Sequence, residues 1–245
     1  MEKAHEVLVG LTTDPRFNWE DKIKEIQKLK DENNPIKRIA FYPTQLELKD
    51  RVLVYKELNK LFKKGSLEQI PHVHLRGDMQ DWELELFKED YGANVFNIHA
   101  MHIDVPAFKK YLDMISIENG HKPLTEKMLD KCAGICLDIS HQEESNYKLS
   151  FLYGLNGLLE KYPIKCCHVS GIKHFKMLNW GYHTHKLSEY SNFEELRYAE
   201  KYKYCLPFWV SLELNNSIEE QYIAIKPYLE ELIIKKENID NMLKR

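Results

Sequence analysis

Short runs of apolar residues alternate with segments of helical periodicity from one end of the chain to the other. The apolar runs are four to six residues long and rich in Val, Ile and Phe, which is typical of strands covered on both faces. We therefore predict eight strands, at Glu6–Leu11, Lys37–Tyr42, His72–Leu75, Val95–His99, Ile115–Glu118, Gly134–Asp138, Lys165–Val169 and Trp209–Leu214.

The segments between these runs carry helix start and stop signals. Asn18 is placed to cap a first helix, and Gly65 is placed to end a second one. Ser217-Ile-Glu-Glu220 has the pattern of a capping box and predicts the start of the last helix, in which Pro227 predicts a kink or a break. Residues 106–113 predict only a short fourth helix.

Strands that alternate with helices in this way predict an α/β fold, a (β/α)8 TIM barrel. No linker, repeat or change of composition divides the chain, so we predict one domain over residues 1–245. The alternative, an open doubly wound sheet, favours a Gly-rich phosphate loop after an early strand, and residues 10–14 contain one glycine. In a barrel, Trp209–Leu214 is expected beside Glu6–Leu11.

The charge balance narrows the range of partners. The chain has 35 Lys and Arg against 38 Asp and Glu, a formal charge of -3, so a nucleic-acid partner needs local basic patches or bound cations. No apolar run approaches the roughly 20 residues of a membrane span, and Met1–Gly10 lacks the pattern of a signal peptide. We expect a cytoplasmic protein with no membrane partner.

Five cysteines, an odd number without zinc-ribbon spacing, indicate free thiols in a reducing compartment. Cys136 and Cys166 each lie two residues before the end of a predicted strand, so both are expected to point into the barrel, one layer beneath that end. Cys167 is expected to face the helices.

Six potential metal ligands mark the C-terminal ends of six successive predicted strands, the third to the eighth. In a barrel these ends surround one pocket, which is the usual place for catalysis. The six residues are His74, His99, Glu118, Asp138, His168 and Glu213. Because side chains alternate with period two, the residues two positions earlier should also point inward. They are mostly small or polar: His72, Asn97, Ser116, Cys136, Cys166 and Ser211.

Three carboxylates and three imidazoles around one mouth predict a divalent cation, which satisfies both kinds of donor. Zinc suits this mixture of ligands, and manganese is an alternative. His141, three residues after Asp138, and the pair in His183-Thr-His185 predict a further site. We expect one to three ions.

The order of these motifs resembles that of the xylose isomerase-like TIM barrels, which include the endonuclease IV and ultraviolet-damage endonuclease families and many sugar epimerases. The resemblance extends from about Lys37 to Leu214. It rests on His74, on His99 in NIHA, on Glu118 in IENG, on Asp138 and His141 in LDISH, on His168 in CCHVS and on Glu213 in SLELN.

The endonuclease branch of that superfamily implies three metal positions. The first would be held by His74, His99 and Glu118, and the second by Glu118, Asp138, His168 and Glu213. The third would be held by His141 and an Asp-x-His pair, in which His185 matches and His183 departs from Asp. In the epimerase branch, only the second set binds metal, and Glu118 and Glu213 exchange a proton with a sugar carbon.

Three functions are consistent with these residues. The first is a metal-dependent phosphoester hydrolase resembling endonuclease IV, acting on a phosphoester such as damaged DNA, with Arg76, Lys173 and Trp180 as substrate contacts. It is favoured by the additional histidines, which a one-metal enzyme does not need. The second is a sugar or sugar-phosphate isomerase or epimerase with Glu118 and Glu213 as its acid and base. The third, a barrel that binds a ligand without turnover, is disfavoured by the intact carboxylate pair.

Overall fold

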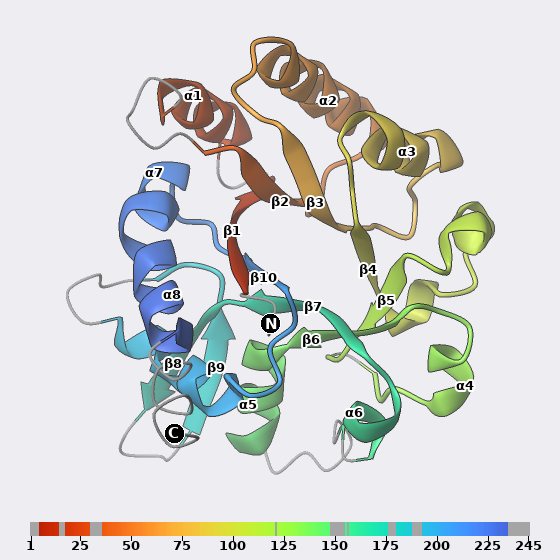
Figure 1. Ribbon diagram of the computed structural model, residues 1–245, viewed down its shortest axis with the longest axis vertical. Helices are drawn as coiled ribbons and strands as arrows, with labels where there is room; N and C mark the ends of the chain where they lie inside the picture. The colour runs from red at the N-terminus through yellow and green to blue at the C-terminus, as the bar shows by residue number, and fades with distance from the viewer. Residues whose placement is uncertain are drawn as a thin grey trace, which may run out of the picture.

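The computed structural model describes residues 5–14, 18–29, 36–120, 122–147, 155, 157–175, 180–187 and 193–234. Eight parallel strands close into a barrel in the order β1-β10-β7-β6-β5-β4-β3-β2 (Figure 1). The strands are β1 (Glu6–Thr12), β2 (Arg38–Tyr42), β3 (Gln69–His74), β4 (Val95–His99), β5 (Ile115–Glu118), β6 (Gly134–Asp138), β7 (Ile164–Val169) and β10 (Trp209–Leu212).

The predicted barrel is therefore confirmed, including its closure. Glu6 of β1 pairs in parallel with Trp209 of β10, as expected for the first and last strands. Strands β4, β5 and β6 begin and end at the predicted residues. Strand β3 begins earlier than predicted, at Gln69, and β10 ends earlier, at Leu212, so Glu213 directly follows the strand.

Helices surround the ring of strands, as Figure 1 shows. The α-helices are α1 (Trp19–Leu29), α2 (Leu48–Lys63), α3 (Asp81–Glu85), α4 (Glu126–Leu129), α5 (Ile139–Tyr147), α6 (Leu158–Lys161), α7 (Ile218–Glu220) and α8 (Lys226–Ile234). The predicted short fourth helix is a 3-10 helix, Pro106–Tyr111. None of the helices in the described part of the chain has the length and apolarity needed to cross a bilayer.

The sequence signals at helix ends operate as predicted. The Asn18 side chain accepts a hydrogen bond from the Glu20 N–H at 3.0 Å, and Ser217 and Glu220 form the capping box. A π-helical turn, Gln221–Ile225, precedes Pro227, so the last helix changes its hydrogen-bond pattern just before the proline.

The sequence pattern did not predict a hairpin between β7 and β10. An antiparallel hairpin of β8 (Gly171–Phe175) and β9 (Trp180–Thr184) follows β7, in a segment for which no strand was predicted, and it lies beside α5 (Figure 1). Its register pairs Ile172 with His183. The prediction was wrong because the polar residues around His183 lack the clean apolar alternation of a half-buried strand.

The barrel interior is polar near its mouth and apolar below it. His72 of β3 forms hydrogen bonds to Asn97 of β4 (3.0 Å) and to Ser211 of β10 (2.6 Å). Since β3 and β10 are not neighbours in the barrel, the contact with Ser211 crosses the interior, and the predicted inward orientation is confirmed. Cys136 and Cys166 pack inside with Val95 and Trp209, whereas Cys167 packs in the outer core, and all five cysteines are free thiols as predicted.

The seam between β1 and β10 needs a glycine and a bridging side chain. A Cβ on Gly10 would lie 1.8 Å from the Leu212 carbonyl oxygen, so only glycine allows this close approach. The Gln221 side chain accepts from the Gly10 N–H (2.8 Å) and donates to its carbonyl (3.1 Å), replacing strand pairing that ends at Leu8 and Ser211.

Candidate metal centre

The centre of the barrel mouth is the carboxylate of Glu118, at the end of β5. Its Oε2 atom lies 3.1 Å from His74 Nε2 and 3.5 Å from His168 Nδ1, and its Oε1 atom lies 3.7 Å from His99 Nε2. The two oxygens thus face histidines from β3, β4 and β7. The strand ends predicted to converge do converge here.

His168 joins this carboxylate to two others. Its Nδ1 atom lies 3.3 Å from Glu213 Oε2 and 4.0 Å from Asp138 Oδ2. The imidazole is fully buried, and neither of its ring nitrogens makes a hydrogen bond within the described residues. A buried nitrogen with three carboxylates within 4 Å and no hydrogen bond is a donor set that a divalent cation would satisfy.

The charges of these groups depend on one another. Burial alone would lower the pKa of His168, but Glu118, Glu213 and Asp138 raise that pKa to about 10. Burial would raise the pKa of Glu213, yet His168 and His185 lower it to about 2. The pKa of Glu118 is held well below its usual range, against the effect of burial, by His168, His74 and His99. Glu118 and Glu213 are therefore ionised at neutral pH, as metal ligands must be.

Neighbouring polar side chains fix the orientation of the carboxylates. Asn97 donates a hydrogen bond to Glu118 Oε2 at 2.8 Å and is itself held by His72. Asp138 Oδ1 accepts from the His141 N–H at 2.8 Å, which caps the first turn of α5 and leaves Oδ2 facing the centre. Such bonds preset the direction in which each ligand points.

A second cluster lies on the hairpin side of the mouth. His141 and Glu144 come from α5, and His183 comes from β9; the rings of the two histidines are 4.5 Å apart, and His183 Nδ1 lies 3.0 Å from Glu144 Oε2. Ligand atoms of the three residues lie within 4.8 Å of one another. Sequence reasoning missed Glu144, although its i,i+3 spacing from His141 on a helix was a usable signal.

His185, which was grouped with His141 in the sequence, has a different contact. Its Nδ1 atom forms a hydrogen bond of 3.1 Å to the backbone carbonyl of Glu213, and its ring lies 5.2 Å from that of His183. Glu144 therefore supplies the carboxylate that the residue at position 183 does not.

A cavity of about 520 Å³ opens beside the centre, over the ends of β2, β3 and β4. Its lining includes His74, His99, Glu213 and the predicted substrate contact Arg76, whose Nε atom bonds Asp78 at 2.9 Å. His102, also in this lining, was not predicted; its ring stacks on that of His99 at 6.4 Å.

Of the two other predicted substrate contacts, Lys173 is not among the residues that line this cavity. Lys173 pairs with Tyr182 in the hairpin, one position away from the pair of Ile172 with His183, so it points to the opposite face from His183. The side chain of Trp180 lies outside the described part of the structure. Substrate contact by either residue stays a prediction.

Similarity between this chain and known proteins is found at the level of structure. No protein-family model matches the chain, and no curated protein matches it. Among solved structures, the chain is similar to a xylose isomerase-like TIM barrel protein from Mycobacterium smegmatis in complex with magnesium. The identity is 12% and the TM-score is 0.47, over 95% of this chain and 98% of that one. The TIM-barrel fold of the present chain follows from its own strand pairing.

Proposed function

We propose that this protein is a metal-dependent phosphoester hydrolase with two or three divalent ions, zinc foremost and manganese as the alternative, at the barrel mouth. The observation that carries the proposal is the shared position of Glu118. Its Oε2 atom lies near His74 of one donor set and near His168 of the other, and its Oε1 atom lies near His99, so this carboxylate is placed to serve two neighbouring ions. A one-metal isomerase does not need the donors on β3 and β4.

The residues divide into three sets. His74, His99 and Glu118 would hold one ion, Glu118, Asp138, His168 and Glu213 a second, and His141, Glu144 and His183 a third, adjoined by His185. When bound, divalent ions supply water activation and charge neutralisation at the phosphoester. Asn97 and the α5 cap keep the carboxylates aimed at the centre, and Arg76 offers a cation to the substrate from the cavity wall.

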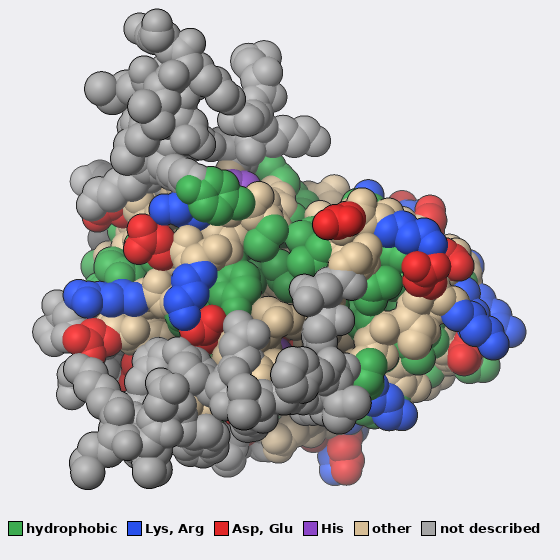
Figure 2. Space-filling model, turned by 90° about the horizontal axis from the view of Figure 1, so that it is seen from below, with side chains coloured by type: hydrophobic (Ala, Val, Ile, Leu, Met, Phe, Trp, Pro, Cys, Tyr) green, Lys and Arg blue, Asp and Glu red, His purple; other side chains and the backbone are tan. Residues whose placement is uncertain are grey.

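The size of the cavity beside the centre indicates a small substrate. Basic and acidic side chains are interspersed on the described part of the face in Figure 2, without an extended basic area. The cavity of about 520 Å³ is the size of small-molecule sites. We therefore favour a compact phosphoester as the substrate, with damaged DNA as the larger substrate to test.

The five free thiols are consistent with a protein of the reducing cytoplasm.

A second candidate, a sugar or sugar-phosphate isomerase, is favoured by one observation. Glu118 at the end of β5 and Glu213 just after β10 both approach His168, and Glu213 also lines the cavity, so a small substrate there would meet the Glu213 carboxylate, which shares the contact with His168 with Glu118. In that reaction Glu118 and Glu213 would exchange a proton with the substrate carbon.

The deciding experiment counts metal ions and measures turnover on the same preparation. Purified protein is analysed for bound metal and then assayed on an abasic-site duplex, a phosphomonoester and common ketoses. Two or three ions with phosphoester cleavage support the hydrolase. One ion with ketose turnover would replace it by the isomerase, and no bound metal would refute both.

A further inference from the structure

The thiol of Cys136 lies beside the central donors of the candidate metal centre. Cys136 of β6 pairs with Glu118 of β5 on one side and with Cys166 of β7 on the other. Side chains of directly paired residues point to the same face of a sheet, so Cys136 shares the interior with Glu118. Cys136 lies two residues before Asp138 on its own strand, as predicted, but the stagger between β5 and β6 brings it level with Glu118 on the neighbouring strand.

The sulfur is within coordinating reach of the central donors. Cys136 Sγ, a carboxylate oxygen of Glu118 and a ring nitrogen of His168 all lie within 4.8 Å of one another. All three residues are buried, with Cys136 and His168 at 0% exposure. His168 has two ring nitrogens without a hydrogen bond within the described residues, so this imidazole has a nitrogen available for an ion.

Cys166 is the natural comparison because it is equally buried and directly paired with Cys136. Its ligand group is a different one, with His72 and Cys136. Both ring nitrogens of His72 are already hydrogen bonded, to Ser211 and to Asn97, so that imidazole is not available without breaking a bond. The observations therefore favour Cys136 over Cys166 as a ligand.

We propose that Cys136 binds the central cation as a thiolate, together with Glu118 and His168, and that it makes the centre selective for a thiophilic ion such as zinc over magnesium or manganese. The inference rests on the metal centre of the proposed function and deepens it. Soft thiolates favour zinc, whereas magnesium and manganese are best served by oxygen donors. One metal–sulfur bond forms, the thiol proton leaves to solvent, and no electron is transferred.

Cobalt(II) is a suitable probe because a thiolate ligand gives it a charge-transfer absorption in the near ultraviolet, which oxygen and nitrogen ligands do not. The metal-free full-length protein is titrated with cobalt(II), alongside Cys136→Ser and the matched control Cys166→Ser. We expect the band in the wild type and in Cys166→Ser, and its loss in Cys136→Ser. Competition should show zinc affinity lowered roughly tenfold or more in Cys136→Ser, with manganese affinity nearly unchanged.

A second measurement uses the wild-type protein, so its result does not depend on whether a variant with a substituted buried cysteine folds. X-ray absorption of the zinc-loaded wild type should show one sulfur at about 2.3 Å among nitrogen and oxygen neighbours. Bound metal with neither sulfur scattering nor the cobalt band would overturn the thiolate while leaving the proposed hydrolase intact. Loss of the band in Cys166→Ser alone would also overturn it, in favour of the group around His72. A protein that binds no divalent metal would refute the proposed function as well.

Discussion

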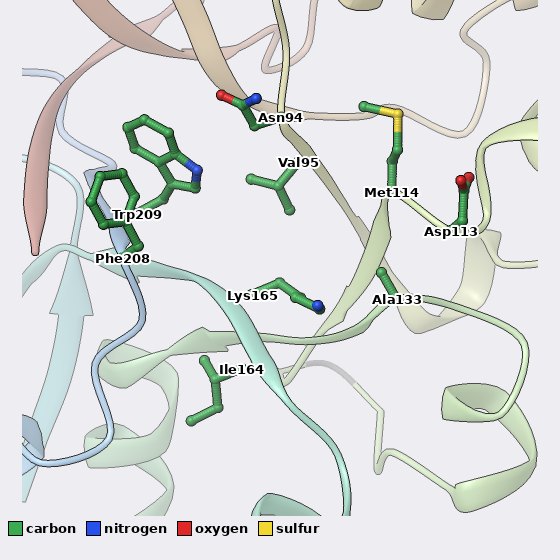
Figure 3. A pocket seen from close by; sticks show the side chains of 9 residues that line it. All are labelled: Asn94, Val95, Asp113, Met114, Ala133, Ile164, Lys165, Phe208 and Trp209. Carbon is green, nitrogen blue, oxygen red and sulfur yellow. The ribbon is translucent and has the colours of Figure 1, made fainter. Parts of the chain in front are cut away.

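The two ends of the barrel each have a cavity, and they differ in what their side chains can do. At the C-terminal end, carboxylates and imidazoles from β3 to β10 converge within about 4 Å of His168 and Glu118. At the N-terminal end, a cavity of about 300 Å³ is lined by residues at or just before strand starts (Figure 3): Asn94, Val95, Asp113, Met114, Ala133, Ile164, Lys165, Phe208 and Trp209.

The charged side chains of the cavity at the N-terminal end do not converge on one point. Figure 3 shows the Asp113 carboxylate and the Lys165 ammonium pointing in different directions, and the Asn94 side chain accepts a hydrogen bond from Gln69 at 2.7 Å. Trp209 packs against Val95, Cys136 and Cys166 and so closes the interior. The two cavities differ in how their polar groups are arranged. A polar cavity is a candidate active site when its donor atoms converge on one point and some of them lack hydrogen bonds. It has a structural role when its polar groups are dispersed or already hydrogen bonded.

The largest effect on metal binding is expected from a change of Glu118, at the C-terminal end of the barrel. Glu118→Gln keeps the size of the side chain and removes the charge shared by two ligand sets, so metal affinity should drop by about 100-fold or more, and turnover with it. Glu213→Gln should lower both by less, because Glu213 belongs to one set. Metal analysis after dialysis and the assay panel described above measure these changes.

The matched control is Glu160→Gln, at an exposed position on α6. An isolated exposed charge contributes little, so metal content and turnover should equal those of the wild type. If Glu213→Gln also retained full metal and full activity, the shared carboxylate pair would be wrong, and both enzymatic proposals would be refuted.

The second effect concerns pH. The pKa of His168 is raised from 6.5 to about 10, so in metal-free protein this group adds stability that is complete below pH 6.5 and is lost as the pH rises through 10. Thermal unfolding of the metal-free protein should therefore shift to lower temperature between pH 7 and 10. With saturating zinc this decline should vanish, because the ion takes the place of the proton. An equal decline with and without zinc would show that the cation does not bind at His168.

A smaller effect is expected at the second cluster. Glu144→Gln removes the carboxylate that lies beside His183 in the second cluster, so one ion should be lost while the ions around Glu118 remain. The measurement is the metal-to-protein ratio, which should decrease by one relative to the wild type. An unchanged ratio would exclude Glu144 as a ligand.

The smallest effect on the metal is expected from the lower end. Trp209→Leu removes packing volume from the closed end of the interior, and we expect a loss of stability of about 1–3 kcal/mol with unchanged metal content per folded molecule. Denaturant unfolding and metal analysis on the same variant test this. Loss of metal at full stability would mean that the two ends are coupled.

The extent to which the sequence predicted these features depends on how local each signal is. The ends of strands carry local signals, because a short apolar run followed by a histidine or an acid marks both the strand and the end of it that faces the barrel mouth. These signals placed His74 and Asp138 correctly. Glu144 was missed because its partner His183 is 39 residues away and comes from a hairpin that the pattern did not predict. The position of Cys136 beside Glu118 depends on strand stagger, which no single strand encodes.

The closure of the barrel by β10 has a consequence for how the chain acquires its site. This last strand holds Ser211, which bonds His72 across the interior, and it leads directly into Glu213. An unfinished or partly folded chain therefore lacks both the final carboxylate and the bond that fixes the opposite wall. Formation of contacts between residues so distant in sequence is slow, so tight binding of the ion assigned to Glu213 would report that β10 has docked and closed the barrel.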